Sequence, residues 1–243
     1  MQNKTVLITG AAGRIGAEIA RTLHADNMDV IIHYNRSGAQ ALALVDELNT
    51  TRQHSASAVQ GNLLNDEALA GIIETAYGFN HGLDALVNNA SSFYPTPVAT
   101  ATTAQWEDLV GTNMKAPFFL SQQAAPYLKK QKGCIINITD IYAERPLRKY
   151  PVYSAAKAGL AMLTRALARE LAPEVRVNAI APGAILWPEG MSNESKNRIT
   201  SRTALGHAGR PADIANAVRF LIRDAGYVTG QILTIDGGRL LNF

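Results

Sequence analysis

Short apolar runs alternate along the chain with longer segments in which apolar residues recur at helical spacing. In the segment after the first run, Ile15, Ile19 and Leu23 fall on one stripe of a helix. The runs predict strands at residues 5–9, 30–33, 57–60, 85–87, 134–138, 175–180 and 232–235. The segments between them predict helices at residues 17–25, 39–48, 66–77, 105–131, 153–171 and 212–222.

This alternation is typical of βαβ units, which build a parallel sheet covered by helices on both faces. No linker, repeat or low-complexity tract interrupts it. We therefore expect an α/β protein: a single domain of Rossmann type over residues 1–243, with a doubly wound parallel sheet of about seven strands. Residues 184–209 have no clear periodicity, and we expect a mobile loop there, on the side where a substrate binds.

Composition excludes several classes of protein. The 243 residues are 47% hydrophobic, which excludes a disordered chain. The net charge is only +3 and the basic residues are scattered along the chain, so we expect no nucleic-acid partner. We recognise no signal peptide and no apolar run near the roughly 20 residues that span a bilayer, and therefore expect a cytoplasmic protein without membrane contact. A single cysteine, Cys134, excludes an internal disulfide and a cysteine-based zinc site, and we expect no metal.

The first predicted strand leads into a glycine-rich turn, Gly10-Ala11-Ala12-Gly13-Arg14-Ile15-Gly16. In a doubly wound sheet such a turn opens a helix, whose N–H groups and dipole hold a pyrophosphate. A glycine-rich turn alone can be purely structural, but its position after the first strand favours a dinucleotide site. We expect the cofactor to contact Gly10, Arg14, Ile15 and Gly16.

The end of the second strand indicates which dinucleotide binds. NAD sites place Asp or Glu there, whereas NADP sites place a cation for the 2′-phosphate. Arg36 stands twenty residues beyond Gly16, and no carboxylate occurs between Asp29 and Asp46. Arg36 could be a solvated surface residue, but a guanidinium binds phosphate in a bidentate fork. The sequence therefore predicts NADPH, held in part by His33, Tyr34, Asn35, Arg36 and Ser37.

Tyr153 and Lys157 are four residues apart and so share one face of a predicted helix. An ammonium group beside a phenol lowers the phenol pKa, so we expect Tyr153 to exchange a proton near neutral pH. Such a pair is common by itself. Here it occurs together with the glycine-rich turn, Asn88-Asn89-Ala90, Asn113 and Pro182-Gly183.

With these residues, the chain resembles the short-chain dehydrogenase/reductases over essentially its whole length. The resemblance implies an NAD(P)(H) oxidoreductase in which Tyr153 donates a proton, Lys157 holds the nicotinamide ribose and Asn113 supports a water relay to Lys157. It also implies cofactor contacts from Asn62, Leu63, Asn89, Ala90, Ser91, Tyr153, Lys157, Pro182 and Gly183. Family members commonly form tetramers, so we expect a homotetramer. Four small residues would let one helix pair closely with a neighbour: Ala155, Ala156, Ala158 and Ala161.

Two positions depart from the general family pattern. The usual turn would require Gly at position 14, where this chain has Arg14. The usual catalytic Ser lies thirteen residues before the tyrosine, where this chain has Asp140. A carboxylate cannot donate a hydrogen bond to a substrate carbonyl unless it is protonated, which disfavours plain ketone reduction. Both departures, together with Phe93-Tyr94-Pro95-Thr96-Pro97, resemble the pteridine reductases, a subgroup of the family.

The subgroup implies that Phe93 stacks on a pterin and that Arg14 and Ser91 touch both the pterin and the cofactor phosphates. Reduction of a pterin C=N bond needs a proton on nitrogen, which Asp140 and Tyr153 could relay. Phe93 could instead be a core residue, and Asp140 could merely cap a turn. The predicted substrate site comprises Arg14, Ser91, Phe93, Asp140, Tyr153, Leu186 and Trp187, although Trp187 could equally pack in the core or an interface.

The resulting expectation is NADPH-dependent reduction of dihydrobiopterin, dihydromonapterin or dihydrofolate to the tetrahydro form. Two alternatives stay open. The first is a general carbonyl or 3-oxoacyl-thioester reductase of the same family, which Asp140 disfavours. The second is a non-catalytic NADPH-sensing protein, which the presence of both Tyr153 and Lys157 disfavours.

Overall fold

The computed structural model describes residues 4–80, 82–187 and 190–242. Within these ranges seven parallel strands form one sheet in the order β3-β2-β1-β4-β5-β6-β7. The strands are β1 (Thr5–Ile8), β2 (Asp29–Tyr34), β3 (Ala56–Gln60), β4 (Ala85–Asn88), β5 (Cys134–Ile138), β6 (Arg176–Pro182) and β7 (Ile232–Ile235). The prediction of a doubly wound parallel sheet is confirmed.

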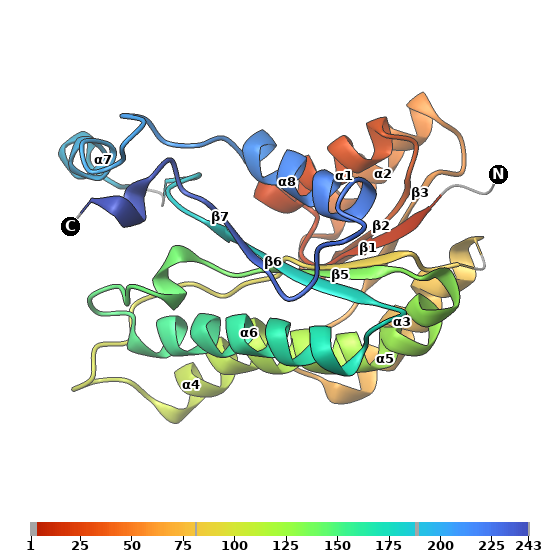
Figure 1. Ribbon diagram of the computed structural model, residues 1–243, viewed down its shortest axis with the longest axis horizontal. Coiled ribbons are helices and arrows are strands. Elements are labelled where there is room, and N and C mark those ends of the chain that lie inside the picture. Colours follow the sequence, from red (N-terminus) through yellow and green to blue (C-terminus); the bar gives the residue numbers. More distant parts are fainter. Residues whose placement is uncertain (1–3, 81, 188–189, 243) are drawn as a thin grey trace.

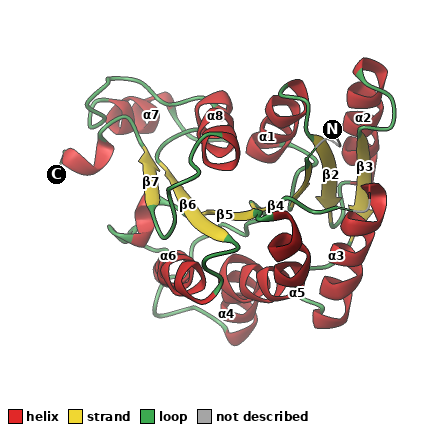
Figure 2. Ribbon diagram, turned by 45° about the vertical axis from the view of Figure 1, so that its right-hand side comes forward, coloured by secondary structure: helices red, strands yellow, loops and turns green. Residues whose placement is uncertain are grey.

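Helices cover both faces of the sheet (Figures 1 and 2). One face carries α1 (Arg14–Ala25), α2 (Gly38–Thr51) and α8 (Pro211–Arg223), and the other carries α3 (Asp66–Asn80), α4 (Thr103–Val110), α5 (Ala116–Gln131) and α6 (Pro151–Glu170). Side chains alternate along each strand: Val6 and Ile8 pack toward the first layer, and Leu7 packs toward the second. No helix in the described part of the chain is long and apolar enough to cross a membrane.

The helix predicted over residues 105–131 is divided into two. Between α4 and α5 the chain makes a π-helical turn, η1 (Gly111–Lys115). The side-chain amide of Asn113 donates to the carbonyl of Leu109, the acceptor that the main-chain N–H of Asn113 would use in an α-helix. Pro117 also has no N–H to offer the carbonyl four residues before it. These two residues explain why the α-helical pattern fails at this point.

The segment 184–209, predicted as a loop without secondary structure, contains a short helix, α7 (Asn193–Thr200). Ser192 caps it by accepting a hydrogen bond from the N–H of Ser195. No residue of α7 is buried, so no apolar stripe marks this helix in the sequence. The mobility of the segment stays a prediction.

The four alanines expected to mediate helix pairing do not share one exposed face. Ala156 and Ala161 are only 1% and 8% exposed, because they pack inside the protein. Ala155 is exposed and Ala158 is half-buried. The argument for close pairing is therefore wrong at two of its four positions, and the homotetramer stays a prediction.

Candidate active site

The carboxyl ends of the central strands meet at one edge of the sheet, where the strand order changes direction between β1 and β4. In open α/β sheets, ligands bind in the crevice at such a point. The predicted site residues follow these strands in space as well as in sequence. The glycine-rich turn follows β1, residues 89–93 follow β4, Asp140 follows β5 and Pro182 ends β6.

Two glycines give the turn after β1 its close fit. Gly10 has a φ of 61°, and a Cβ on it would lie 2.9 Å from the Cα of Ala90. A Cβ on Gly16 would lie 2.6 Å from the carbonyl oxygen of Gly10. Gly13, the N-cap of α1, makes no side-chain cap hydrogen bond, so the first N–H groups of the helix are available to an anion.

Arg14, the first residue of α1, has a left-handed backbone with a φ of 55°. This conformation costs a residue with a Cβ about 1–2 kcal/mol. The backbone therefore explains why the family pattern has glycine at this position. The Arg14 side chain is exposed beside the turn, and its role in ligand binding stays a prediction.

Thr9 and Asn89 fasten the turn to the end of β4. The Thr9 hydroxyl accepts hydrogen bonds from the N–H groups of Asn89 and Ala90, at 2.9 and 3.0 Å. The Asn89 side chain donates to the carbonyl oxygens of Thr9 and Gly10, at 2.8 and 3.1 Å. The amide of Asn89, expected to bind the cofactor, thus braces the turn that would hold it. Thr9 was not among the predicted site residues.

His33 supports the same turn from within the protein. Its Nδ1 accepts a hydrogen bond from the Gly10 N–H at 3.2 Å, so the ring proton lies on Nε2, which donates to the Gly61 carbonyl at 3.1 Å. Burial lowers the pKa of His33 to about 4, and the ring is neutral at physiological pH. With an exposure of only 1%, this side chain supports the turn from inside the protein, and the contact of His33 with a cofactor stays a prediction.

Arg36 and Ser37 are exposed beyond the end of β2. Arg36 makes no ion pair with any residue in the described ranges. Ser37 is the N-cap of α2, yet its hydroxyl makes no cap hydrogen bond. In the part of the chain that the structure describes, a guanidinium without an ion pair and a helix N-terminus without a side-chain cap therefore lie at the position expected to bind a 2′-phosphate.

The neighbouring predicted contacts divide between surface and core. Asn35 is exposed, and its carbonyl accepts a hydrogen bond from Gln60 at 3.1 Å. Tyr34 is half-buried against the start of α2. Asn62 is exposed, whereas the Leu63 side chain is 7% exposed and belongs to the core. Only the backbone of Leu63 is available to a cofactor.

A direct hydrogen bond joins the side chains of Tyr153 and Asp140 in the site. The Tyr153 hydroxyl donates to Asp140 Oδ2 at 2.7 Å. Asp140 Oδ1 accepts the N–H of Tyr142 at 2.9 Å and thereby caps a short 3₁₀ helix, η2 (Ile141–Ala143). From the sequence, Asp140 could either cap a turn or act together with Tyr153. The structure gives one task to each oxygen.

The pKa of Tyr153 differs from the expectation. Burial, and next the charge of Asp140, raise the pKa of Tyr153 well above its ordinary value. The prediction that Lys157 lowers it is wrong for this arrangement: Lys157 Nζ donates to the Ile138 carbonyl at 2.9 Å and lies 5.7 Å from the ring centroid of Tyr153. Burial also raises the pKa of Asp140 and lowers that of Lys157 to about 8. Tyr153 therefore holds its proton at neutral pH.

Asn113 is fully buried, and its side chain has partners on every side. Its Oδ1 accepts from the Ser91 hydroxyl at 2.7 Å, and its Nδ2 donates to the carbonyls of Ser92 and Leu109, each at 2.9 Å. Ser91 also forms a hydrogen bond with Tyr153 that opposes the rise in the tyrosine pKa. Asn113 is thus linked to Tyr153 through Ser91. Within the described ranges no hydrogen bond joins it directly to Lys157.

Phe93 is 43% exposed and is therefore not a core residue. Its ring stacks on Tyr150, with centroids 4.7 Å apart and planes 16° apart, and meets Tyr153 edge-on at 4.8 Å. Tyr150 was not predicted to belong to the site. Pro151 carried the signal, because proline favours the first position of a helix and so places Tyr150 beside Tyr153 at the start of α6.

The segment that carries Phe93 is fastened at both ends. The Tyr94 hydroxyl donates to Asp108 of α4 at 2.7 Å, and the Ser92 hydroxyl donates to the same carboxylate at 3.2 Å. The Thr96 N–H donates to the Lys149 carbonyl at 2.7 Å. Phe93 is therefore presented on a braced loop.

Pro182 and Gly183 close the site at the end of β6. The Gly183 N–H donates to the Ile235 carbonyl at 2.9 Å, and a Cβ on Gly183 would lie 2.7 Å from the Cα of Asp236. Leu186 is 36% exposed and Trp187 is half-buried. The part of these two side chains in the substrate site stays a prediction.

Comparison with known proteins agrees with this architecture. The family described as enoyl-(acyl carrier protein) reductase matches residues 10–239. Pteridine reductase 1 of Leishmania tarentolae is 33% identical, over 96% of this chain and 94% of its own length. The chain belongs to the short-chain dehydrogenase/reductase family.

Other relatives of this short-chain dehydrogenase/reductase are similar to the same degree. The 3-oxoacyl-(acyl-carrier-protein) reductase FabG of Staphylococcus aureus strain N315 is 34% identical over 97% of both chains. The enzyme of the same name from Aquifex aeolicus is 34% identical over 98% of both chains. The protein is therefore an oxidoreductase of a family that uses nicotinamide cofactors. These identities do not distinguish a pterin from a 3-oxoacyl thioester.

The turn after β1 fits such a cofactor. Side chains at Gly10 and Gly16 would fill the space that brings backbone N–H groups close to a pyrophosphate. The uncapped start of α1 and the exposed Arg14 supply positive potential there. When bound, the nicotinamide supplies a hydride. Tyr153 keeps its proton because its pKa is raised, and its role as the proton donor stays a prediction.

Proposed function

We propose that the protein reduces dihydropterins to tetrahydropterins with NADPH. The candidate substrates are dihydrobiopterin and dihydromonapterin, with dihydrofolate as a further one. The observation that supports this most directly is the 2.7 Å hydrogen bond from Tyr153 to Asp140 Oδ2. Where most family members have a serine that donates to a carbonyl, this chain has a carboxyl group that can exchange a proton with the tyrosine.

The proton chemistry of this pair suits a C=N bond. Its reduction adds a hydride to carbon and a proton to nitrogen, and the Tyr153 hydroxyl is the proton donor. Burial raises the pKa of Asp140, which increases its capacity to return a proton to the phenolate. Lys157, whose pKa of about 8 leaves it mostly charged at neutral pH, binds the nicotinamide ribose in this proposal.

The walls of the site suit a flat, polar heterocycle. Phe93 offers an exposed ring face, while Tyr150 stacks on it and fixes its orientation. Ser91 lies within hydrogen-bond distance of both Asn113 and Tyr153. Arg14, held in a strained conformation beside the turn, is the cation nearest the cofactor phosphates in this proposal and bonds the polar edge of the pterin.

The preference for NADPH over NADH rests on Arg36 and Ser37. Both are exposed at the end of β2, and among the described residues Arg36 has no ion-pair partner and the Ser37 hydroxyl makes no cap hydrogen bond. The 2′-phosphate of NADPH would accept a bidentate pair of hydrogen bonds from the guanidinium.

A 3-oxoacyl thioester is the second candidate substrate, and the 34% identity to the FabG enzymes supports it. Asp140 counts against it, because a carboxyl group donates a hydrogen bond to a carbonyl oxygen only while it is protonated. Burial raises the pKa of Asp140, so weak activity of this kind is compatible with the site.

The test is a comparison of initial rates of NADPH oxidation with dihydrobiopterin, dihydromonapterin, dihydrofolate and a 3-oxoacyl thioester. We expect a dihydropterin to have a kcat/KM at least about tenfold above that of the thioester, a difference of roughly 1.4 kcal/mol in transition-state binding. Tyr153→Phe should abolish the reaction and bind NADPH normally. A rate with the thioester alone would overturn the proposal.

A further inference from the structure

The orientation of the exposed Phe93 ring depends on its two neighbours in the chain. The side chains of Ser92 and Tyr94 both form hydrogen bonds to α4. The ring of Phe93 lies instead against Tyr150 and Tyr153, at the start of α6. Consecutive side chains of this loop therefore contact different helices. Whatever holds Ser92 and Tyr94 on α4 also fixes the side to which Phe93 points.

A single carboxylate, that of Asp108, holds both neighbours. Its Oδ2 accepts the Tyr94 hydroxyl at 2.7 Å, and its Oδ1 accepts the Ser92 hydroxyl at 3.2 Å. Hydrogen bonds to an ionised acceptor are stronger than those between neutral groups. Burial, and next the hydrogen bond with Asp108, raise the pKa of Tyr94 to about 12, so Tyr94 keeps the proton that it donates. Within the described ranges Asp108 forms no ion pair that would compete with this loop.

Asp108 and Asn113 hold the loop from one continuous helical segment. Asp108 lies in the last turn of α4, and η1, which contains Asn113, follows at once. Asn113 accepts the Ser91 hydroxyl and donates to the Ser92 carbonyl, so it holds the loop before Phe93. Asp108 is the charged member of the pair, and its two oxygens hold the side chains on either side of Phe93.

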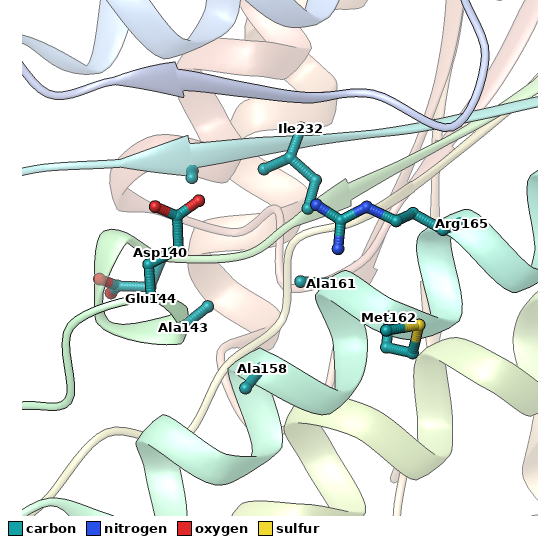
Figure 3. A pocket seen from close by; sticks show the side chains of 9 residues that line it. Asp140, Ala143, Glu144, Ala158, Ala161, Met162, Arg165 and Ile232 are labelled. Carbon is teal, nitrogen blue, oxygen red and sulfur yellow. The ribbon is translucent and has the colours of Figure 1, made fainter.

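The cavity that borders Asp140 offers no comparable surface for a flat ring. It has a volume of about 120 Å³ and lies between α6 and the strands β6 and β7 (Figure 3). The described residues that line it include alanines such as Ala158 and Ala161 and charged groups such as Arg165, and none of them carries an aromatic ring. Stacking on a flat substrate therefore depends on Phe93 and on the residues that hold it.

We propose that Asp108 is a positioning residue that sets the specificity of the site for a flat heterocycle: by holding Ser92 and Tyr94, it keeps the Phe93 ring ready to stack. A ring that is already ordered binds more tightly, because less conformational entropy is lost on binding. An acyl thioester has a flexible chain and no flat ring, so its binding does not depend on this orientation. The inference rests on the proposed function in taking a pterin as the substrate that Phe93 meets.

Asp108→Ala tests this role, with Glu107→Ala as its matched control. Alanine favours a helix, so α4 should persist, and Glu107 is an exposed acidic residue next to Asp108. In Asp108→Ala we expect the KM for a dihydropterin to rise about three- to tenfold, while kcat and NADPH affinity change by less than about twofold. The kinetics with a 3-oxoacyl thioester should not change, and Glu107→Ala should behave as wild type. Equal losses in KM, kcat and NADPH affinity would show a general structural role and overturn the inference.

Two milder variants separate the hydrogen bonds from the folding of α4. Tyr94→Phe removes one of the two hydroxyl contacts and leaves Asp108 unchanged, so it tests the inference even if Asp108→Ala fails to fold. It should raise the KM for the pterin by less than Asp108→Ala does. Asp108→Asn should recover part of the loss, because an amide still offers one acceptor oxygen. A wild-type KM in Tyr94→Phe and Asp108→Asn together with a wild-type KM in Asp108→Ala would overturn the inference.

A double-mutant cycle asks whether Asp108 acts through Phe93. In a Phe93→Ala background, Asp108→Ala should raise the KM for the pterin no further, because the ring that Asp108 orients is gone. Independent effects of the two substitutions, which multiply in KM, would show that Asp108 acts on the substrate by another route.

Fluorine NMR of the protein without substrate provides a measurement that no activity enters. With 4-fluorophenylalanine at position 93, we expect one narrow signal, displaced by the ring of Tyr150 on which Phe93 stacks. In Asp108→Ala the signal should broaden and move toward that of the free amino acid, and in Glu107→Ala it should not change. Identical signals in Asp108→Ala and wild type would overturn the inference. If the wild-type protein reduces no pterin, the proposed function fails by itself, and the fluorine signal still decides whether Asp108 orients Phe93.

Discussion

The hydroxyl of Tyr153 donates to one oxygen of Asp140 at 2.7 Å, while the other oxygen of the same carboxylate accepts the N–H of Tyr142 at 2.9 Å. Oδ1 therefore has a structural task, the cap on η2, and Oδ2 faces the hydroxyl of Tyr153. Because an amide keeps one carbonyl oxygen but cannot relay a proton, substitution can separate the two tasks.

Asp140→Asn should keep the fold, the cap on η2 and NADPH binding, and lose pterin reduction. We expect a loss of at least about tenfold, since positioned proton donors typically contribute 10²–10⁴ in rate. Asp140→Ser should lose it too, and gain weak activity on simple ketones because a hydroxyl donates a hydrogen bond. Single-turnover NADPH oxidation with saturating dihydropterin is the measurement. Wild-type rates in both variants would mean that Asp140 only caps its turn.

Arg36→Ala should weaken NADPH binding and leave NADH binding unchanged. The loss of a charge-assisted, bidentate contact costs about 1.5–3 kcal/mol, which is roughly ten- to a hundredfold in affinity. Fluorescence titration with both nucleotides measures the ratio. Arg21→Ala is the control, because Arg21 is an exposed arginine that pairs with Glu47 instead. Unchanged NADPH affinity in Arg36→Ala would refute the assignment.

Phe93→Ala should raise the KM for the pterin and leave NADPH affinity nearly unchanged. Phe93 binds the heterocycle equally in the ground and transition states, so its loss affects KM more than kcat. Tyr150→Ala, which frees the Phe93 ring from its stack, should act in the same direction with a smaller effect. If NADPH affinity collapses in Phe93→Ala, the residue is structural.

Arg14→Gly should have two effects: it should stabilise the folded protein and weaken cofactor binding. Glycine removes the strain of the left-handed backbone at a φ of 55°. After the entropy cost of glycine, the net gain is about 0.5–1 kcal/mol in the free energy of unfolding. Urea unfolding without ligand and NADPH titration measure the two effects. A variant that is less stable would show that the Arg14 side chain supports the fold itself.

His33 should make stability fall as the pH drops. Its pKa of about 4 in the folded protein lies below the ordinary value of 6.5, so the unfolded chain binds the proton first. Its contribution is therefore complete above about pH 6.5 and is lost progressively toward pH 4, by up to about 1.4 kcal/mol per pH unit. Urea unfolding across this range should give a shallower slope for His33→Asn. An identical slope would contradict the assignment.

Much of the fold could be predicted from the sequence because it follows from local patterns. Apolar runs such as 134–138 and helical stripes such as Ile15, Ile19 and Leu23 report which faces are buried, and strict alternation of strands and helices leaves few topologies. The helix α7 was missed because none of its residues is buried. The division of helix 105–131 was missed because it depends on the Asn113 side chain, which competes for a main-chain acceptor.

For the candidate site, the sequence by itself determined which residues follow which strand: the glycine-rich turn, Asp140, and the pair Tyr153 and Lys157. Only the tertiary structure decided what they touch. It placed His33 and Asn89 beneath the turn as braces, gave Asp140 two partners, and put Tyr150 behind Phe93. It also reversed the expected pKa shift of Tyr153. Burial and the distance between charges set a pKa, and both arise from contacts between residues far apart in the chain, which a spacing in sequence does not encode.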